Sequence, residues 1–204
     1  DFILNTHHHP DHTGGNLDLK KEFGARVVGP GKDAERIAGL DIGVDESTSW
    51  MFGARAVTVL EIPAHTSSHI AFAFEDFVFT GDTLFAMGCG RLFEGTPQMM
   101  WDSLGKLMKL PDAMRVYCGH EYTLTNGRFA LTLEPGNADL VARMREVVAL
   151  RGKGLPTIPS SIGLEKKTNP FVRAASPEIR RSLGLETASD VEVFAEMRRR
   201  KDEF

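Results

Sequence analysis

The chain has 204 residues, of which 42% are hydrophobic and 25% are charged, so it is long enough to bury a substantial core. Without a run of about 18 apolar residues, the sequence excludes a membrane-spanning helix, and its composition excludes a disordered chain. The formal net charge of -4 argues against a protein that binds nucleic acid regardless of sequence. The two cysteines, Cys89 and Cys118, are too few for a disulfide framework. We therefore expect a soluble globular protein of a reducing compartment.

Up to about residue 122, short apolar runs alternate with helical patterns, which is typical of an α/β fold. Most of the expected strands are bounded by Gly, Pro or Asp; they span residues 2–4, 26–28, 57–62, 70–74, 77–79 and 116–118. The expected helices in this part span residues 17–23 and 99–110. The second has apolar side chains at core spacing, namely Trp101, Leu104, Leu107 and Met108.

After residue 122 the strand patterns disappear, and Pro and Gly divide the remainder into helical pieces. The longest spans residues 137–150, with Asn137 as its cap and one apolar stripe formed by Leu140, Val141, Met144, Val147 and Val148. Further helices begin at residues 176–177 and at Ser189 or Asp190. The sequence thus predicts an α/β domain over residues 1–122 and a small helical domain over residues 123–204.

All seven histidines fall in three short segments, whereas ordinary core or surface histidines would be scattered. The first segment reads H-x-H-x-D-H and directly follows an expected strand. His7 and His9 are two residues apart and therefore point the same way, so they can share one metal ion. The following turn directs Asp11 and His12 toward a neighbouring point. This segment predicts two metal sites close together.

The other histidines, and one aspartate, follow apolar strands at turns marked by Gly or Pro. These residues are His65, His69, Asp82 and His120. Each alone would usually be an ordinary histidine or turn residue, but strand ends at one sheet edge are where α/β folds gather their chemistry. Imidazole and carboxylate are ligands that zinc, iron and manganese accept. Together with the first segment they predict a metal centre.

The segments THHHPDH, PAHTSSH, FTGDTLF, GCGRLFEGT, CGHEYT and NPFVR, with the ending RRRKDEF, resemble the glyoxalase II family, the hydroxyacylglutathione hydrolases of the metallo-β-lactamase superfamily. The resemblance covers nearly the whole chain, including the helical tail. It implies a metallo-β-lactamase-like αββα sandwich followed by a small C-terminal helical domain. Because several strands precede the motif in that family, we expect the given sequence to be partial at its N-terminus.

The resemblance also implies two divalent metal ions per chain, zinc as the first choice and iron or manganese as alternatives. One ion would be held by His7, His9 and His65, and the other by Asp11, His12 and His120, with Asp82 and a water or hydroxide bridging the two. Coordination lowers the pKa of a bound water from about 15.7 to about 7, so the bridging hydroxide is the expected nucleophile. Asp11 and Asp82 are thus the expected catalytic carboxylates.

The implied reaction is hydrolysis of S-D-lactoylglutathione to glutathione and D-lactate, the second step of methylglyoxal detoxification. We expect a cytoplasmic monomer with a small-molecule substrate and neither a nucleic-acid nor a membrane partner. Matching positions place Arg91, Phe93, Tyr122, Arg198 and Lys201 around the glutathione. The family often has Lys-Phe-Tyr where this chain has residues 91–93, so one tyrosine hydroxyl is missing. By charge pattern alone, residues 198–201 predict a solvated face instead.

Several assignments remain open at the level of sequence. We expect His8 to be exposed, whereas His69 has even odds of bonding a ligand carboxylate and Glu121 of bonding the site. One alternative function is a persulfide dioxygenase of the same superfamily, with a single iron on His7, His65 and Asp82. Another is a truncated, non-catalytic chain.

Overall fold

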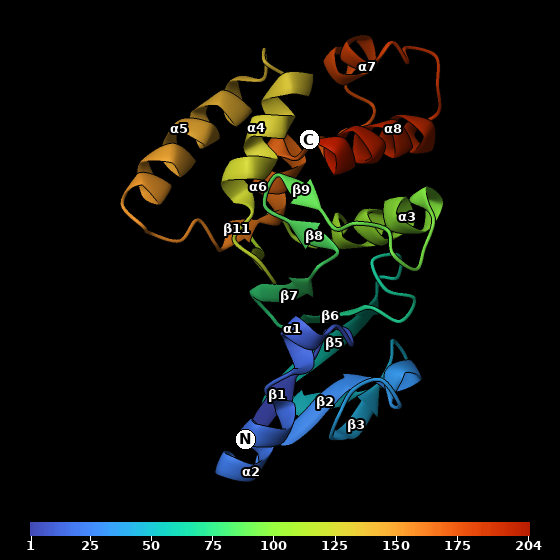
Figure 1. Ribbon diagram of the computed structural model, residues 1–204, viewed down its shortest axis with the longest axis vertical. Helices are drawn as coiled ribbons and strands as arrows, with labels where there is room; N and C mark the ends of the chain where they lie inside the picture. Colours follow the sequence, from blue (N-terminus) through green and yellow to red (C-terminus); the bar gives the residue numbers. More distant parts are fainter.

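The computed structural model describes residues 1–204, and its strands form two main sheets and a small hairpin (Figure 1). The first sheet has the order β1-β2-β3, and the second has the order β11-β10-β7-β6-β5-β4. The strands are β1 (Phe2–Leu4), β2 (Arg26–Pro30), β3 (Leu40–Val44), β4 (Trp50–Phe52), β5 (Arg55–Glu61), β6 (Ile70–Ala73), β7 (Phe77–Gly81), β8 (Leu84–Phe85), β9 (Gly88–Cys89), β10 (Arg115–Cys118) and β11 (Ser160–Ser161). Strands β8 and β9 form the hairpin.

The six-stranded sheet is covered on both faces, as strand β6 shows. All four residues of β6 are buried, and alternate side chains of a strand point to opposite faces. Ala71 and Ala73 join the large apolar cluster that includes the C-terminal helices. Ile70 and Phe72 join a second cluster with residues of the three-stranded sheet. The sheet is therefore sandwiched between the helical tail and the first sheet.

The helices are α1 (Pro10–Thr13), α2 (Asn16–Phe23), η1 (Gly31–Asp33), α3 (Pro97–Leu107), α4 (Thr123–Leu133), α5 (Ala138–Gly152), α6 (Ile162–Thr168), η2 (Pro170–Val172), α7 (Pro177–Leu183) and α8 (Asp190–Glu203). In Figure 1 the helices α4 to α8 gather at the C-terminal end of the molecule, opposite β1 to β3 and α2. No helix combines the length and the apolar composition that crossing a membrane requires.

Most elements lie where the sequence predicts them. Every expected strand is present within one or two residues of its predicted bounds, and Asn137 and Ser189 cap α5 and α8 through their side chains. Strands β3, β4, β8 and β9 were not predicted from the sequence. Three predictions were also wrong: α3 ends at Leu107, Val148 is 55% exposed, and a short strand, β11, follows residue 122. This strand forms because residues 160–161 pair with β10, a tertiary contact that local sequence does not reveal.

The helical tail and the β domain share one apolar core, which fixes the tail over the site. The largest cluster joins Ile62 and Val78 of the β domain to Phe171 and Phe194 of the tail. At the end of this contact the Arg198 guanidinium donates from Nη1 to the carbonyl oxygen of residue 89, at 2.7 Å. Helix α8 is thereby held against the β8–β9 hairpin.

An apolar groove of about 470 Å³ lies beside β1. Its lining is mainly aromatic and includes Phe2, Phe52, Phe74 and Phe79. Strand β1 is the outer strand of its sheet. Large apolar side chains of both sheets therefore face accessible space on this side of the molecule.

Candidate metal centre

The loop that follows β1 carries the first cluster of candidate ligands. Pro10 at the first position of α1 ends the extended segment, because its fixed φ suits the start of a helix. The Asn5 side chain donates to the carbonyl oxygen of His12 at 3.0 Å and accepts from the Asn16 side chain at 2.8 Å. The loop is therefore closed on itself by buried amides.

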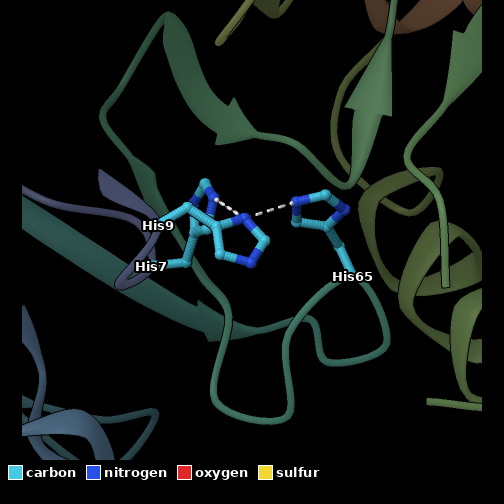
Figure 2. A group of neighbouring side chains, drawn as sticks. All are labelled: His7, His9 and His65. Atoms are coloured by element: carbon cyan, nitrogen blue, oxygen red, sulfur yellow. Dashed lines mark hydrogen bonds between the residues drawn. The ribbon is translucent and has the colours of Figure 1, made fainter. Parts of the chain in front are cut away.

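Three imidazoles converge at the end of this loop, and we call His7, His9 and His65 the inner group. The Nδ1 atom of His9 lies 3.2 Å from Nε2 of His7 and 3.1 Å from Nε2 of His65. Figure 2 shows the His9 ring between the other two. His7 and His65 are only 0% and 4% exposed, whereas His9 is half-buried and borders the cleft over the site. Two of the three imidazoles are therefore almost completely shielded from water.

A second set of ligand atoms lies beside the first, and we call Asp11, His12 and His120 the outer group. The Nε2 atoms of His12 and His120 are 3.2 Å apart, and Nε2 of His120 lies 3.3 Å from Oδ2 of Asp11. The Asp11 side chain is 59% exposed. This group is therefore open to solvent.

Asp82 joins the two groups. Its Oδ1 lies 3.3 Å from Nε2 of His12, and its Oδ2 lies 3.3 Å from Nε2 of His120 and 3.6 Å from Nε2 of His65. The buried Oδ1 accepts no hydrogen bond, and a Cβ at Gly119 would stand 2.3 Å from it. A buried carboxylate oxygen without a donor is costly unless a cation neutralises it, so the residues fit bound metal ions.

The protonation states favour cation binding. Burial, followed by the neighbouring imidazoles, lowers the pKa of His7, and burial lowers the pKa of His65. Burial opposes the charged forms of both Asp82 and His12, but the electrostatic attraction between the two side chains, 3.3 Å apart at Oδ1 and Nε2, lowers the pKa of Asp82 and raises that of His12. Metal ligands must be neutral imidazoles and ionised carboxylates, and at neutral pH the inner imidazoles and Asp82 already have those forms.

Contacts behind the candidate ligands hold them in place. The Nδ1 atom of His65 faces the carbonyl oxygen of Arg91 at 2.9 Å, which leaves Nε2 for a cation. His69 is buried, and its Nε2 accepts from the backbone N–H of Asp82 at 3.1 Å. The bond of His69 is therefore to the backbone of a candidate ligand and not to its carboxylate.

A cleft of about 580 Å³ opens over the metal centre. Its lining includes all the predicted substrate-binding residues, which are Arg91, Phe93, Tyr122, Arg198 and Lys201. The exposed Phe93 ring lies 5.2 Å from the ring of His65, and the Tyr122 ring stacks on His120 at 5.0 Å. One aromatic ring thus stands beside each group of ligands.

The basic residues of α8 do not form a uniform solvated face. Arg198 is 6% exposed and donates from Nη2 to Asp202 at 2.8 Å, while its Nε has no partner. The ammonium of Lys201 lies 5.6 Å from the ring centre of Phe129. The solvated-face interpretation is therefore wrong for Arg198.

Two residues near the ligands differ from expectation. His8 is half-buried, and its Nδ1 lies 3.2 Å from Oδ2 of Asp33, so the prediction that it is exposed was wrong. Glu121 accepts from the backbone N–H of Thr157 at 2.7 Å and contacts no candidate ligand. Sequence reasoning missed Asp33, because a single aspartate in a Gly-Lys-Asp turn carries no distinctive pattern.

Two family models match the chain: residues 1–120 match the metallo-beta-lactamase superfamily, and residues 121–204 match the hydroxyacylglutathione hydrolase C-terminus. A hydroxyacylglutathione hydrolase of Methylococcus capsulatus is 53% identical over 204 residues, which is 99% of this chain and 80% of that protein.

Solved structures share the architecture. The crystal structure of ETHE1 from Myxococcus xanthus has a TM-score of 0.65 at 27% identity and covers 97% of this chain and 68% of that one. TTHA1623, solved in a di-iron-bound form, has a TM-score of 0.54 at 25% identity, with 82% and 75% covered. Together with the two family models and the full-length match, these likenesses show that the chain belongs to the hydroxyacylglutathione hydrolase family of the metallo-β-lactamase superfamily.

Proposed function

We propose that this chain hydrolyses S-(2-hydroxyacyl)glutathione thioesters, and S-D-lactoylglutathione first among them, to glutathione and the free hydroxy acid. The observation that carries the proposal is Asp82, which stands between two groups of candidate ligands at the floor of a cleft. The same cleft is lined by the cations Arg91, Arg198 and Lys201, which suit an anionic tripeptide. Family membership supports the same reaction.

We assign one divalent metal ion to the inner group and one to the outer group, with Asp82 bridging them. The short distances between ligand atoms and the unpartnered Oδ1 of Asp82 support this assignment. Zinc is the first choice because imidazole and carboxylate suit it, and iron is the main alternative because TTHA1623 was solved with two irons.

Bound metal ions would supply a water nucleophile at neutral pH and polarise the thioester carbonyl. Water adds to the carbonyl carbon, the C–S bond breaks, and the products are a thiol and a hydroxy acid that loses its proton at neutral pH. Asp11 faces the cleft with an exposed carboxylate, and we assign it the role of holding the attacking water by accepting its hydrogen bond. A cysteine nucleophile is disfavoured, because burial raises the pKa of Cys89 to about 11.

The two family models meet between residues 120 and 121, close to the proposed division into a catalytic domain, 1–122, and a substrate-binding domain, 123–204. The second domain would supply Arg198 and Lys201 for the glutathione carboxylates. Arg91, Phe93 and Tyr122, which line the same cleft, would also contact the glutathione. Both cysteines are free, which fits a reducing compartment such as the cytoplasm, and we propose that the protein is a monomer.

The test is to load purified protein with zinc and to follow thiol release from S-D-lactoylglutathione. We expect turnover that a chelator abolishes and added zinc restores, together with two metal ions per chain. A folded protein with two metal ions and no thiol release would contradict the proposal. Oxygen consumption with a persulfide substrate and a single iron would favour the dioxygenase, although that enzyme would not need the outer group.

A further inference from the structure

A buried carboxylate outside the metal centre lies next to the ligand loop. The Asp33 side chain is 1% exposed. Its Oδ2 faces Nδ1 of His8 at 3.2 Å and accepts from the Ser68 hydroxyl. Its Oδ1 accepts from Nε of Arg36 at 2.8 Å and also from Nη2 of Arg36. Every side of this carboxylate therefore has a donor, as a buried charge requires.

A second carboxylate binds the other end of the same guanidinium. Glu94 accepts from Nη1 of Arg36 at 2.7 Å, and from the backbone N–H and the hydroxyl of Ser67 at 2.7 and 2.8 Å. The Arg36 hydrogen bond lowers the pKa of Glu94 to about 2, so Glu94 is ionised at neutral pH. We call Asp33, Arg36 and Glu94, with their partners His8, Ser67 and Ser68, the Arg36 network.

The Arg36 network ties together three loops that converge on the inner group. His8 stands between the candidate ligands His7 and His9, and Ser67 and Ser68 follow the third, His65. The remaining loop contains Arg91 and Phe93, which line the cleft, and Glu94 directly follows Phe93. No member of the network belongs to the outer group.

Ordering these loops has a free-energy cost. Because the network already orders them in the metal-free protein, metal binding does not have to supply that free energy. A buried ion pair is a weak source of stability compared with apolar packing, but a fully satisfied polar network fixes one arrangement of the groups it joins. His8 illustrates this: a proton on Nδ1 lets it donate to Asp33, while Nε2 accepts from Nη1 of Arg36 at 3.3 Å. The His8 backbone is therefore held from both sides of its ring.

We propose that the Arg36 network is a positioning device for the inner group, holding the loops of His7, His9 and His65 in the geometry that binds the first metal ion. The inference rests on the proposed metal centre, but not on the identity of the thioester substrate. It predicts an effect on metal affinity that is confined to the inner group.

The test is Asp33→Asn, which keeps the shape of the side chain but turns a donor toward its neighbours. We would make it in a His120→Ala background, where the outer group is disabled, and measure zinc affinity by competition with a chelating indicator. Loss of a contact behind metal ligands typically weakens affinity by about 10- to 100-fold, and we expect a change of that size. In the chain with an intact outer group, the weaker of the two zinc constants should change by less than about 3-fold.

Glu134→Gln is the matched control. The Glu134 side chain is 3% exposed, and it accepts from Nε and Nη2 of Arg173 at 3.0 and 2.8 Å and from the Ser176 hydroxyl. These contacts have the same chemistry as those of Asp33 with Arg36 and Ser68. However, Glu134, Arg173 and Ser176 do not lie in a loop that carries a candidate ligand. The control should lower the melting temperature and leave both zinc constants unchanged.

Two milder variants keep the inference testable if Asp33→Asn does not fold. Ser68→Ala removes one donor from Asp33, and Glu94→Gln weakens the opposite end of the network while the Asp33–Arg36 pair stays intact. Each should weaken inner-group zinc binding several-fold.

Folded variants with unchanged zinc constants and a lower melting temperature of the metal-free protein would overturn the inference, because the network would then be merely structural. Equal loss at both constants would overturn it as well. Zinc is measured without substrate, so failure of the hydrolysis assay leaves this result independent.

Discussion

The inner and outer groups use the same ligand chemistry but differ in burial and support. In the inner group, His7 and His65 are 0% and 4% exposed, and each has its second ring nitrogen near a fixed oxygen, of Thr6 or Arg91. In the outer group the side chains of Asp11 and His120 are 59% and 27% exposed. The inner group is therefore organised by the fold, whereas the outer group would depend more on a bound ion for its geometry.

The largest effect should come from Asp82→Asn, which neutralises the carboxylate that lies between the two groups. The amide keeps the shape but loses the charge that would lie between two cations. We expect kcat/KM for S-D-lactoylglutathione to fall by about 10³-fold, which corresponds to about 4 kcal/mol of lost transition-state stabilisation. The measurement is steady-state thiol release with zinc in excess. A loss below about tenfold would show that the two groups work without their shared carboxylate.

Next in size is the difference between His120→Ala and His9→Ala, which remove one half-buried imidazole from each group. A chelator titration of the wild type should release two zinc ions in separate steps. In His120→Ala the weaker step should disappear while the tighter step stays. In His9→Ala the tighter step should weaken by at least about 100-fold, because removing a metal ligand lowers the affinity more than removing a residue that only hydrogen-bonds to a ligand. Release in a single step from the wild type would contradict the comparison.

The buried imidazoles of His7 and His69 should also make the protein less stable in acid. Burial lowers the pKa of His69 from 6.5 to about 3 and also lowers the pKa of His7. Below pH 6.5 the unfolded chain takes up protons that the folded chain refuses, so the free energy of unfolding falls as the pH drops toward 3. Urea unfolding of the metal-free protein at pH 7.5 and at pH 5.5 measures this loss.

A matched variant isolates the imidazole of His69. In His69→Gln an amide oxygen can still accept from the N–H of Asp82, but residue 69 itself no longer titrates between pH 3 and 6.5. Its loss of stability on acidification should therefore be smaller than in the wild type. For His12, whose pKa is raised, the sign is opposite: the stabilisation is present in acid and is lost as the pH rises. An unchanged slope in His69→Gln would contradict the assignment.

The sequence alone could place the candidate ligands, because each segment that carries them follows an apolar strand and strand ends meet at one edge of the sheet. His7, Asp82 and His120 lie together in the structure as that pattern predicts. It could not place Asp33 or Arg36, because their contacts join loops 25 to 58 residues apart that share no local pattern. Strand β11 was not predicted for the same reason, since it exists only through its pairing with β10.

The smallest expected effect concerns the two aromatic rings, one beside each group. Phe93 is 61% exposed near the inner group, and Tyr122 is 51% exposed on the outer group. Phe93→Tyr adds the hydroxyl that this chain lacks at that position, and one new hydrogen bond to the tripeptide is worth about 0.5 to 1 kcal/mol. KM for S-D-lactoylglutathione should then fall about 2- to 5-fold, with kcat within about 2-fold of the wild type. Tyr122→Phe is the matched control, since it removes a hydroxyl and keeps the ring stacked on His120, so its KM should rise or stay level. A change in kcat without a change in KM in Phe93→Tyr would mean that the ring acts on the reacting centre of the inner group and not on the bound glutathione.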